Sequence, residues 1–541
     1  MKIELNFPRK IVNRISKFFE NLDYGVIVAF PASFLAVIAS FYAYTHHIII
    51  AYGDAESHLN IAKRVVSGLT PGFAQLGGIW LPLPHILLVP FVSSDYLWRS
   101  GLAGSIVSGI CFIFSAYFIH KLTIRLTQNI YAGFVASLVF ITNLNALYMQ
   151  STPMTELPLI LFLILSTYYF VIYLQEDTFT ALILAALWGL AASLSRYDGW
   201  FLVAIEAFII FAKNFPIRNF LENIKKRGLG LFSFITEKTE GELFLFSTLA
   251  FIGVAGWFLW DGLILGDPLY FTNSQFSAKS QQQAFLQRGM LTAFHNLPLS
   301  SIQYLATVME TVGILVFGLS IVALIVFLID KKIKNRFYFV LILLTPLIFN
   351  VLTLFLGQSI IFIPDVTPAS FEWRLFNVRY GIMMLPAIAI FVGYLFYKVK
   401  TFGKSLIVIL IALNLGLFAI GYTRVIDLDD GLVGLSHSVH PDAEFWLHKN
   451  YDNGLVLLDD YARTMSVIGS GIPMQDIVYI GNHPYWENAL KNPQDVVKWV
   501  ILQKDDSVLN ALFATPDEQG RLYTYFHKVY TSDNILIFER N

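Results

Sequence analysis

Long apolar runs recur along this sequence and leave few folds open to it. A helix needs roughly 20 apolar residues to cross the hydrocarbon core of a membrane, where it satisfies its own backbone polar groups. On this basis we count about eleven runs, covering approximately residues 24–44, 99–120, 130–149, 155–174, 179–195, 199–213, 243–264, 308–329, 337–356, 380–397 and 404–422. They predict an all-α polytopic membrane domain over residues 1–422.

The composition agrees with a membrane protein. Of the 541 residues, 56% are hydrophobic and 14% are charged, whereas soluble domains have about 25% charged residues. The formal net charge of -1 gives no basic excess that would predict a nucleic-acid partner. Membrane lipid is the partner that the composition predicts.

The chain changes character after Tyr422. Short β-rich runs at 454–460, 476–482, 497–503 and 534–539 alternate with helix-like stretches such as PDAEFWLHKNY. This alternation predicts a small α/β domain over residues 423–541, outside the membrane.

Basic residues in the short connections predict the orientation of the chain. Cytoplasmic connections are enriched in Lys and Arg. Such residues cluster before the first run and after the second, sixth, eighth and tenth runs, at Arg9, Lys10, Arg14, Lys17, Lys121, Arg125, Lys213, Arg218, Lys225, Lys226, Arg227, Lys331, Lys332, Lys334, Arg336, Lys398, Lys400 and Lys404. We therefore expect a cytoplasmic N-terminus, and we expect the first loop (52–90) and the C-terminal domain on the extracytoplasmic face.

The first outer loop predicts an amphipathic helix at the membrane surface over residues 54–67. Its apolar positions share one helical face, at Ala55, Leu59, Ala62, Val66 and Leu69. Asp54 and His58 are spaced to share a ligand, and Glu56 points to the other side of such a helix. A role for Asp54 as the helix N-cap is the alternative.

Other ionisable residues stand at the outer ends of the apolar runs. Glu156 heads the fourth run, and Arg196 and Asp198 lie between two short runs. Ionisable groups at this depth are costly and face a cavity or a charged partner. The alternative is that Arg196 forms an ion pair with Asp198 or Glu156 that only closes a loop.

Two further stretches carry candidate residues. Asp267 lies in WDGLILGDPLYF, where a turn explains it as well as a functional role does. Arg374, Arg379 and Tyr380 precede the tenth run. Two arginines on an outer face call for an anionic partner, and phosphate matches the guanidinium fork. A lipid headgroup or a salt bridge with Glu372 is the alternative.

No metal cluster stands out by spacing. Hard cations need only a few carboxylate oxygens together with water and substrate phosphate. A divalent cation, Mg²⁺ or Mn²⁺, held by Asp54, Glu56 or Glu156 therefore stays open.

Taken in order, these motifs resemble a known family. GDAESHLN, MTELP, SRYDGW, GDPLYF and NVRY are similar to motifs of the GT-C class of integral-membrane glycosyltransferases, nearest to the protein O-mannosyltransferases and the aminoarabinose transferases of lipid A. The likeness covers roughly residues 25–400. This chain has Asp-Ala-Glu at 54–56, where the O-mannosyltransferases carry adjacent Asp-Glu.

The resemblance implies an inverting transfer of a sugar from a polyprenyl-phosphate carrier to a glycan, lipid or protein acceptor. It implies that Asp54 is the general base, with Glu56 or Glu156 positioning the acceptor or a metal. The residues that would hold the lipid phosphate are Arg379, Arg374, Tyr380, Arg196, Lys63 and Arg64, and those that would shape the acceptor site are His58, Asp198 and Asp267.

Four alternatives stay open at this point. One is a transporter or flippase of lipid-linked sugars, and another is a non-catalytic scaffold whose outer domain binds partners. Within the enzyme class, the alternatives are an oligosaccharyltransferase that uses a lipid-pyrophosphate donor and a mechanism with two catalytic carboxyl groups.

Overall fold

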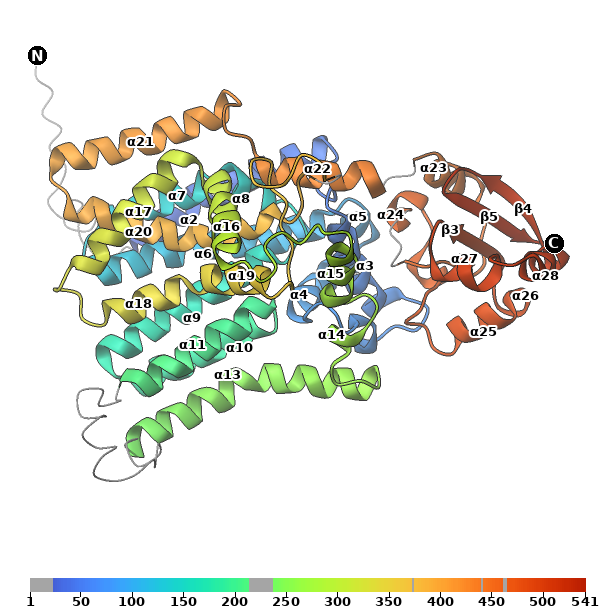
Figure 1. Ribbon diagram of the computed structural model, residues 1–541, viewed down its shortest axis with the longest axis horizontal. Helices are drawn as coiled ribbons and strands as arrows, with labels where there is room; N and C mark the ends of the chain where they lie inside the picture. Colours follow the sequence, from blue (N-terminus) through green and yellow to red (C-terminus); the bar gives the residue numbers. More distant parts are fainter. Residues whose placement is uncertain (1–22, 214–236, 372–373, 439–440, 461–464) are drawn as a thin grey trace, which may run out of the picture.

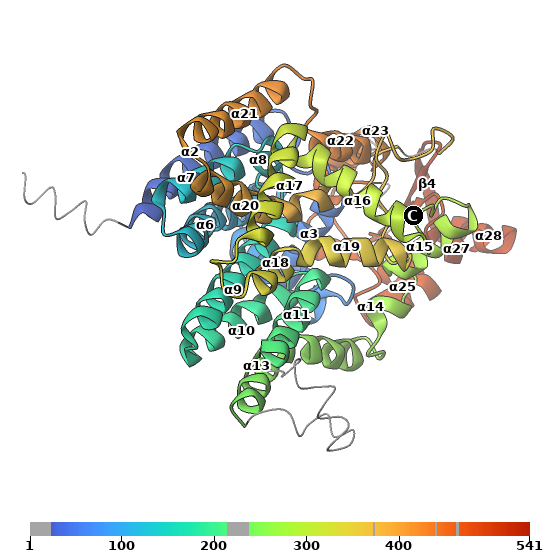
Figure 2. The same cartoon turned by 60° about the vertical axis from the view of Figure 1, so that its left-hand side comes forward.

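The computed structural model describes residues 23–213, 237–371, 374–438, 441–460 and 465–541. A bundle of long helices forms one end of the molecule and a small sheet with short helices forms the other (Figure 1). Shorter helices lie between these two parts (Figures 1 and 2). The basic residues within 1–22 and 214–236, on which the predicted orientation partly depends, lie outside the described ranges.

Each predicted apolar run overlaps one or more helices of the bundle. These helices are α2 (Tyr24–Thr45), α6 (Leu102–Thr127), α7 (Ile130–Ile141), α9 (Glu156–Glu176), α10 (Phe179–Ser193), α11 (Tyr197–Lys213), α13 (Glu237–Ile264), α16 (Leu297–Val312), α17 (Ile314–Ile329), α18 (Arg336–Leu343), α19 (Thr345–Phe355), α20 (Leu385–Lys398) and α21 (Thr401–Ala419). Among the described residues, six helices are long and apolar enough to cross a membrane, or up to eight if each bent pair is one span. The count of eleven stays a prediction.

One of the bent pairs shows how the bundle tolerates a broken helix. Helices α16 and α17 meet at 117° on either side of Gly313, which has a φ of 86°. A break leaves the last carbonyls of a helix without intrahelical partners. Asn143 and Asn145 donate to the carbonyl of Thr311 at 3.0 and 2.8 Å, and Asn414 donates to that of Val312 at 3.0 Å. Asparagine side chains from other elements thus satisfy the break.

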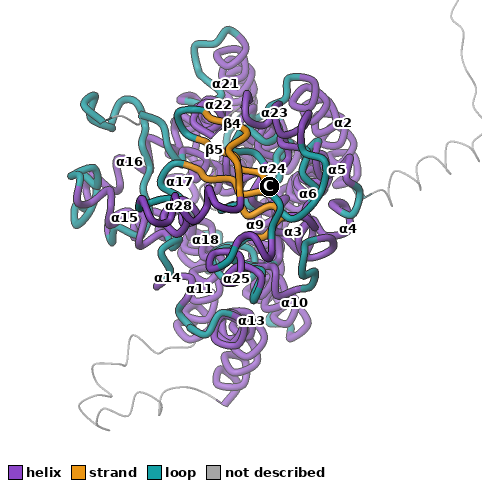
Figure 3. The backbone as a smooth tube through the Cα atoms, turned by 90° about the vertical axis from the view of Figure 1, so that its right-hand side faces the viewer, coloured by secondary structure: helices purple, strands orange, loops and turns teal. Residues whose placement is uncertain are grey.

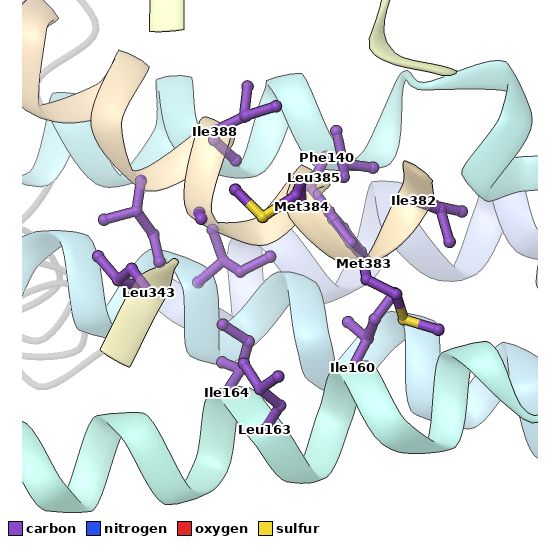
Figure 4. Packing of buried hydrophobic residues seen from close by; sticks show 14 of the residues in the cluster. Phe140, Ile160, Leu163, Ile164, Leu343, Ile382, Met383, Met384, Leu385 and Ile388 are labelled. Atoms are coloured by element: carbon purple, nitrogen blue, oxygen red, sulfur yellow. The ribbon is translucent and has the colours of Figure 1, made fainter. Parts of the chain in front are cut away.

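Two helices form the centre of the bundle. In the most apolar windows of α9 and of the segment Val378–Lys398, 83% of the residues are buried, against 22% in α2, α13 and α21. Ile160 and Ile164 of α9 belong to the same core as Leu385 and Ile388 of α20 (Figure 4). The N-terminal ends of these two central helices carry Glu156 and Arg379, so packing fixes where both side chains lie.

Short elements form a layer between the bundle and the sheet. They are α3 (Gly53–Ser67), η1 (Phe73–Leu76), α4 (Leu83–Val92), α5 (Asp95–Arg99), α8 (Leu144–Met149), α14 (Tyr270–Asn273), α15 (Ala278–Gln287), η3 (Val378–Met384) and α22 (Ile426–Ser438). Helix α3 confirms the predicted helix, and Ala55, Leu59 and Ala62 are buried as expected, although Val66 is exposed. The N-cap of α3 is Tyr52, so the alternative role of Asp54 as the cap is wrong.

The C-terminal part is a small α/β domain, as predicted. Its elements are α23 (Pro441–Asn450), β1 (Val456–Leu457), α24 (Val467–Ser470), η4 (Met474–Asp476), β2 (Ile477–Val478), α25 (Tyr485–Lys491), α26 (Pro493–Val496), β3 (Trp499–Gln503), α27 (Ser507–Leu512), α28 (Pro516–Tyr525), β4 (Phe526–Thr531) and β5 (Ile535–Arg540). The sheet order is β2-β1-β3-β5-β4, and Figure 3 shows the strands in orange with β4 and β5 labelled. The first three strands are parallel, whereas β5 is antiparallel to β3 and β4.

Strand β4 is the one element of this sheet that the sequence did not predict. It is an edge strand, and most of its side chains are exposed or half-buried, so it lacks an apolar run. The boundary at residues 422 and 423 stays a prediction. Helix α22 follows that boundary and packs against α8, η3 and α3 of the preceding part.

Candidate active site

A continuous series of ion pairs lies where four segments of the chain meet. Arg379 of η3 donates from Nη2 to Oδ2 of Asp54 in α3 at 2.7 Å, and from Nε to Oε1 of Glu156 in α9 at 3.2 Å. The same Glu156 oxygen accepts from Nη1 of Arg196 at 2.9 Å. Arg379 therefore contacts both Asp54 and Glu156, although the three residues lie far apart in the sequence.

The segment between α10 and α11 completes the series. Arg196 also donates from Nε to Oδ2 of Asp198 at 3.3 Å and from Nη1 to Oγ1 of Thr155 at 3.0 Å. The other oxygens of Glu156 and Asp198 are buried and have no hydrogen-bond partner among the described residues. Three carboxylates thus share two guanidinium groups, and two carboxylate oxygens retain accepting capacity.

Aromatic rings enclose both guanidinium groups. Arg379 lies 5.0 Å from the ring centroid of Tyr52 and 5.3 Å from that of Tyr380. Arg196 lies 5.1 Å from the same Tyr380 ring. Aromatic faces attract cations and hold a planar guanidinium in place. Tyr380, predicted to contact phosphate, therefore lies where it orients the two arginines.

Burial differs along the series. The side chains of Glu156 and Asp198 are 0% and 3% exposed, those of Arg379 and Arg196 are 8% and 18% exposed, and that of Asp54 is 24% exposed. Buried charges persist only where they are paired. Asp54 is the most accessible member, so a ligand reaches the series first at its carboxylate.

Glu56 lies away from this series, on the opposite side of α3. It accepts hydrogen bonds from Oγ of Ser466 at 2.7 Å and from the backbone N–H of Ile468 at 2.9 Å. Burial raises the pKa of its carboxyl group, and these hydrogen bonds oppose that effect. Glu56 therefore joins α3 to α24 of the C-terminal domain.

Two other basic residues of α3 also lie elsewhere. Lys63 donates to the carbonyl of Val92 at 2.9 Å and pairs with Asp95. Arg64 pairs with Asp460 and stacks 3.8 Å above the ring of Tyr479. The structure does not bring either residue to Arg379.

Two predicted residues occupy exposed loops. Asp267 accepts from the backbone N–H of Leu269 at 2.9 Å and from Asn273 at 3.0 Å, which is the turn geometry of the alternative reading. Arg374 is exposed and donates to the carbonyl of Pro364. Its suggested partner Glu372 lies outside the described residues.

His58 lies one turn after Asp54, in a small cluster of rings. Its Nδ1 atom is 2.8 Å from Nε2 of His85, and its ring meets that of Trp80 edge to face. Burial lowers the pKa of His85 to about 4. His58 belongs to α3 and His85 to α4, so the pair joins these two helices.

The acidic residues of α22 were not among the site residues predicted from the sequence. Asp427 is buried, and neither of its carboxylate oxygens has a hydrogen-bond partner among the described residues. Burial raises the pKa of Asp430 to about 6, although nearby Arg379 lowers it. The run IDLDDG was the available signal, but it follows the last apolar run and was assigned to the separate domain.

The metal prediction stays open. Within the ranges that the structure describes, no group of three or more His, Cys, Asp and Glu side chains could hold a metal ion. Of the three predicted ligands, Asp54 and Glu156 are bridged by Arg379, and Glu56 is turned toward the C-terminal domain.

Comparison with known proteins gives matches in structure but not in sequence. No protein-family model and no curated protein matches the chain. Its structure is similar to that of ArnT from Cupriavidus metallidurans bound to undecaprenyl phosphate, with a TM-score of 0.55 and 11% identity over 96% of this chain and 98% of that one. For ArnT in the apo state the TM-score is 0.52, with 12% identity over 90% and 92%.

A third solved structure is the archaeal oligosaccharyltransferase AglB from Archaeoglobus fulgidus, in complex with an inhibitory peptide and a dolichol-phosphate. Its TM-score is 0.48, with 12% identity over 97% of this chain and 75% of that one. The similarity to ArnT extends over nearly the whole chain, through the membrane helices and the C-terminal domain. The chain therefore has the fold of the GT-C class of integral-membrane glycosyltransferases, as its ordered motifs predicted.

Proposed function

We propose that this protein is an inverting glycosyltransferase that moves a sugar from a polyprenyl-phosphate carrier to an acceptor on the extracytoplasmic face. The observation that carries the proposal is the contact of Arg379 with both Asp54 and Glu156 at the outer ends of the central helices. It combines a partly accessible carboxylate with a guanidinium that can bind phosphate. The shared fold with ArnT, which was solved with undecaprenyl phosphate, supports the choice of donor.

The arrangement suits a single displacement. The acceptor hydroxyl attacks the anomeric carbon, the bond from that carbon to the phosphate oxygen breaks, and polyprenyl phosphate leaves with the electron pair. Asp54 accepts the proton of the hydroxyl as general base. Phosphate is already a good leaving group, so no acid is required, and Arg379 stabilises the charge that develops on it.

The ion pair between Asp54 and Arg379 also links donor binding to the availability of Asp54 as a base. In the structure Arg379 holds the Asp54 carboxylate at 2.7 Å. When donor phosphate binds, it competes for the same guanidinium and leaves Asp54 to the acceptor. Glu156 remains paired with Arg196, and this pair keeps the remaining side chains of the series in position.

The distribution of basic residues supports the proposed sidedness. The connections at 330–335 and 398–400 lie at the end of the bundle away from the sheet (Figure 1). They contain Lys331, Lys332, Lys334, Lys398 and Lys400. Because such connections favour the cytoplasm, the candidate site and the C-terminal domain face the outside.

The decisive experiment follows release of free polyprenyl phosphate from radiolabelled polyprenyl-phosphate sugars in nanodiscs, with glycan, lipid and peptide acceptors. Wild-type protein should release it, and Asp54→Asn should lose at least 100-fold in rate while still binding donor. Asp267→Asn is a matched control on an exposed turn and should keep the wild-type rate. A chelator arm tests for a required Mg²⁺ or Mn²⁺. Donor binding without any release would instead favour a transporter of lipid-linked sugars.

A further inference from the structure

Asp430 of α22 connects the two segments that carry the Asp54–Arg379 ion pair. Its Oδ2 atom accepts from the hydroxyl of Tyr52 at 3.3 Å and from the backbone N–H of Val378 at 3.2 Å. Tyr52 lies two residues before Asp54, and Val378 immediately precedes Arg379. One carboxylate therefore bridges chain segments that are more than 300 residues apart.

Each of these contacts has a structural reason. The first N–H groups of a helix have no intrahelical acceptor, and the Val378 N–H, the first of η3, is satisfied by Asp430. Tyr52 is the N-cap residue of α3. Asp430 thus holds the beginnings of two elements at once, and these are the ends that carry the candidate catalytic groups.

Asp430 lies in a helix, α22, that hydrogen bonds hold in place. The Tyr52 hydroxyl also donates to the carbonyl of Asp427 at 2.6 Å. The N–H of Asp427 donates to Oδ1 of Asn145, next to the start of α8, at 3.0 Å. Asp430 is 5% exposed. Helix α22 is thereby fixed to the bundle through its first turn.

We propose that Asp430 is a positioning residue that sets the register of α3 against η3, so that Asp54 and Arg379 face the same donor. This inference rests on the proposed function. Asp430 acts through Tyr52 and Val378, and the Tyr52 ring in turn lies under the Arg379 guanidinium at 5.0 Å. Because a displacement of about 1 Å between reacting groups costs on the order of 100-fold in rate, a residue that sets this register controls kcat.

The test compares two substitutions at Asp430 by their kinetic constants. Asp430→Ala removes the acceptor, and kcat for polyprenyl-phosphate release should fall by about 30- to 100-fold while KM for the donor changes less than threefold. Asp430→Asn retains an amide oxygen that accepts from the same two donors, so its kcat should stay within about threefold of wild type. This rescue distinguishes hydrogen-bonded positioning from a need for negative charge.

A double-mutant cycle distinguishes the loss of this specific connection from a general loss of folding. Tyr52→Phe removes only the hydroxyl and keeps the ring beneath Arg379. Its effect on kcat should largely disappear when Asp430 is already alanine, because both changes break one connection. Asp429→Asn is the matched control, because the neighbouring Asp429 is half-buried and pairs with the exposed Arg424, and it should leave kcat unchanged.

The outcomes separate the inference from the proposed function. If wild-type protein releases polyprenyl phosphate and Asp430→Ala does so at the same rate, the positioning role is wrong while the transferase survives. If the Tyr52 and Asp430 effects simply add, or if Asp430→Asn is as slow as Asp430→Ala, the positioning role is also overturned. Absence of release by the wild-type protein with every donor contradicts the proposed function itself.

Discussion

Arg379 and Asp54 are separated by 325 positions in the sequence, yet their side chains meet at 2.7 Å. Each belongs to a different kind of element. Asp54 lies in the first turn of a helix outside the bundle, and Arg379 lies at the head of a central apolar helix. Their contact joins a proton acceptor to a phosphate-binding group, and the expected consequences can be measured.

Arg379→Lys should weaken donor binding by about 10- to 100-fold. Lysine keeps the positive charge but loses the fork that reaches Asp54 and Glu156 together, and a charged hydrogen bond contributes about 1.5 to 3 kcal/mol. Titration of a labelled polyprenyl-phosphate sugar into nanodiscs that hold the protein measures the effect. Arg374→Lys, at an exposed position outside the series, is the control and should bind normally. Equal weakening in both variants would count against a phosphate role specific to Arg379.

Glu156→Gln should destabilise the folded protein by about 3 kcal/mol and also abolish transfer. The substitution leaves the buried guanidinium groups of Arg196 and Arg379 without the carboxylate they share, and breaking a buried pair is strongly unfavourable. Thermal unfolding in detergent checks the result. Glu176→Gln, in the last turn of the same helix, removes an exposed ion pair with Arg125. That control should cost less than about 1 kcal/mol, so two similar shifts would contradict the prediction.

Glu56→Ala should loosen the C-terminal domain. Its carboxylate accepts from Ser466 and from the backbone of Ile468, so hydrogen exchange over residues 466–470 should accelerate about tenfold if roughly 1.5 kcal/mol is lost. Transfer should decline less than in Asp54→Asn. Loss of transfer as complete as in Asp54→Asn, with unchanged exchange, would restore the predicted catalytic role of Glu56.

Asp430→Asn should be more stable than wild type above pH 6, although it is expected to keep kcat. Burial raises the pKa of Asp430 from 3.8 to about 6. Between these values the folded state binds the proton that the unfolded state releases, so wild-type stability falls as the pH rises. A shift of about two units corresponds to roughly 3 kcal/mol.

The measurement is a series of thermal melts of both proteins from pH 4 to pH 8. The melting temperature of Asp430→Asn should exceed that of wild type at pH 8, and the difference should shrink toward pH 4, where the aspartate of the folded state is protonated and as uncharged as asparagine. A constant difference across this range would show that the Asp430 charge is not the cause.

Local patterns were sufficient for most elements. Hydropathy placed the long helices, and periodicity placed α3, because both signals are contained within 15 to 20 neighbouring residues. The number of membrane spans was harder to predict from the sequence. The pair α16 and α17, and the pair α18 and α19, are each bent within a single apolar run. Strand β4 lacked an apolar pattern because it lies at the edge of the sheet.

Only part of the candidate site could be predicted from the sequence. Asp54, Glu156, Arg196, Asp198 and Arg379 could be proposed because charge beside an apolar run is costly and needs a reason. Spacing within α3 also indicated that Glu56 faces away from Asp54, and it does. Arg64 and Lys63 were predicted to hold the lipid phosphate, but they lie away from Arg379. Their acidic partners, Asp460 and Asp95, come from other segments of the chain.

The sequence by itself determined a helical membrane protein with a C-terminal part of alternating strands and helices and with motifs that resemble those of the GT-C class, because each of these signals is contained in neighbouring residues. Only the tertiary structure decided which charges meet. The acidic run that holds Asp427 and Asp430 was visible in the sequence, but nothing near it, or near Tyr52, indicated a place beside Arg379. The physical reason is that a buried charge is stabilised by whatever partner the packing brings to within about 3 Å, and that partner can come from any part of the chain.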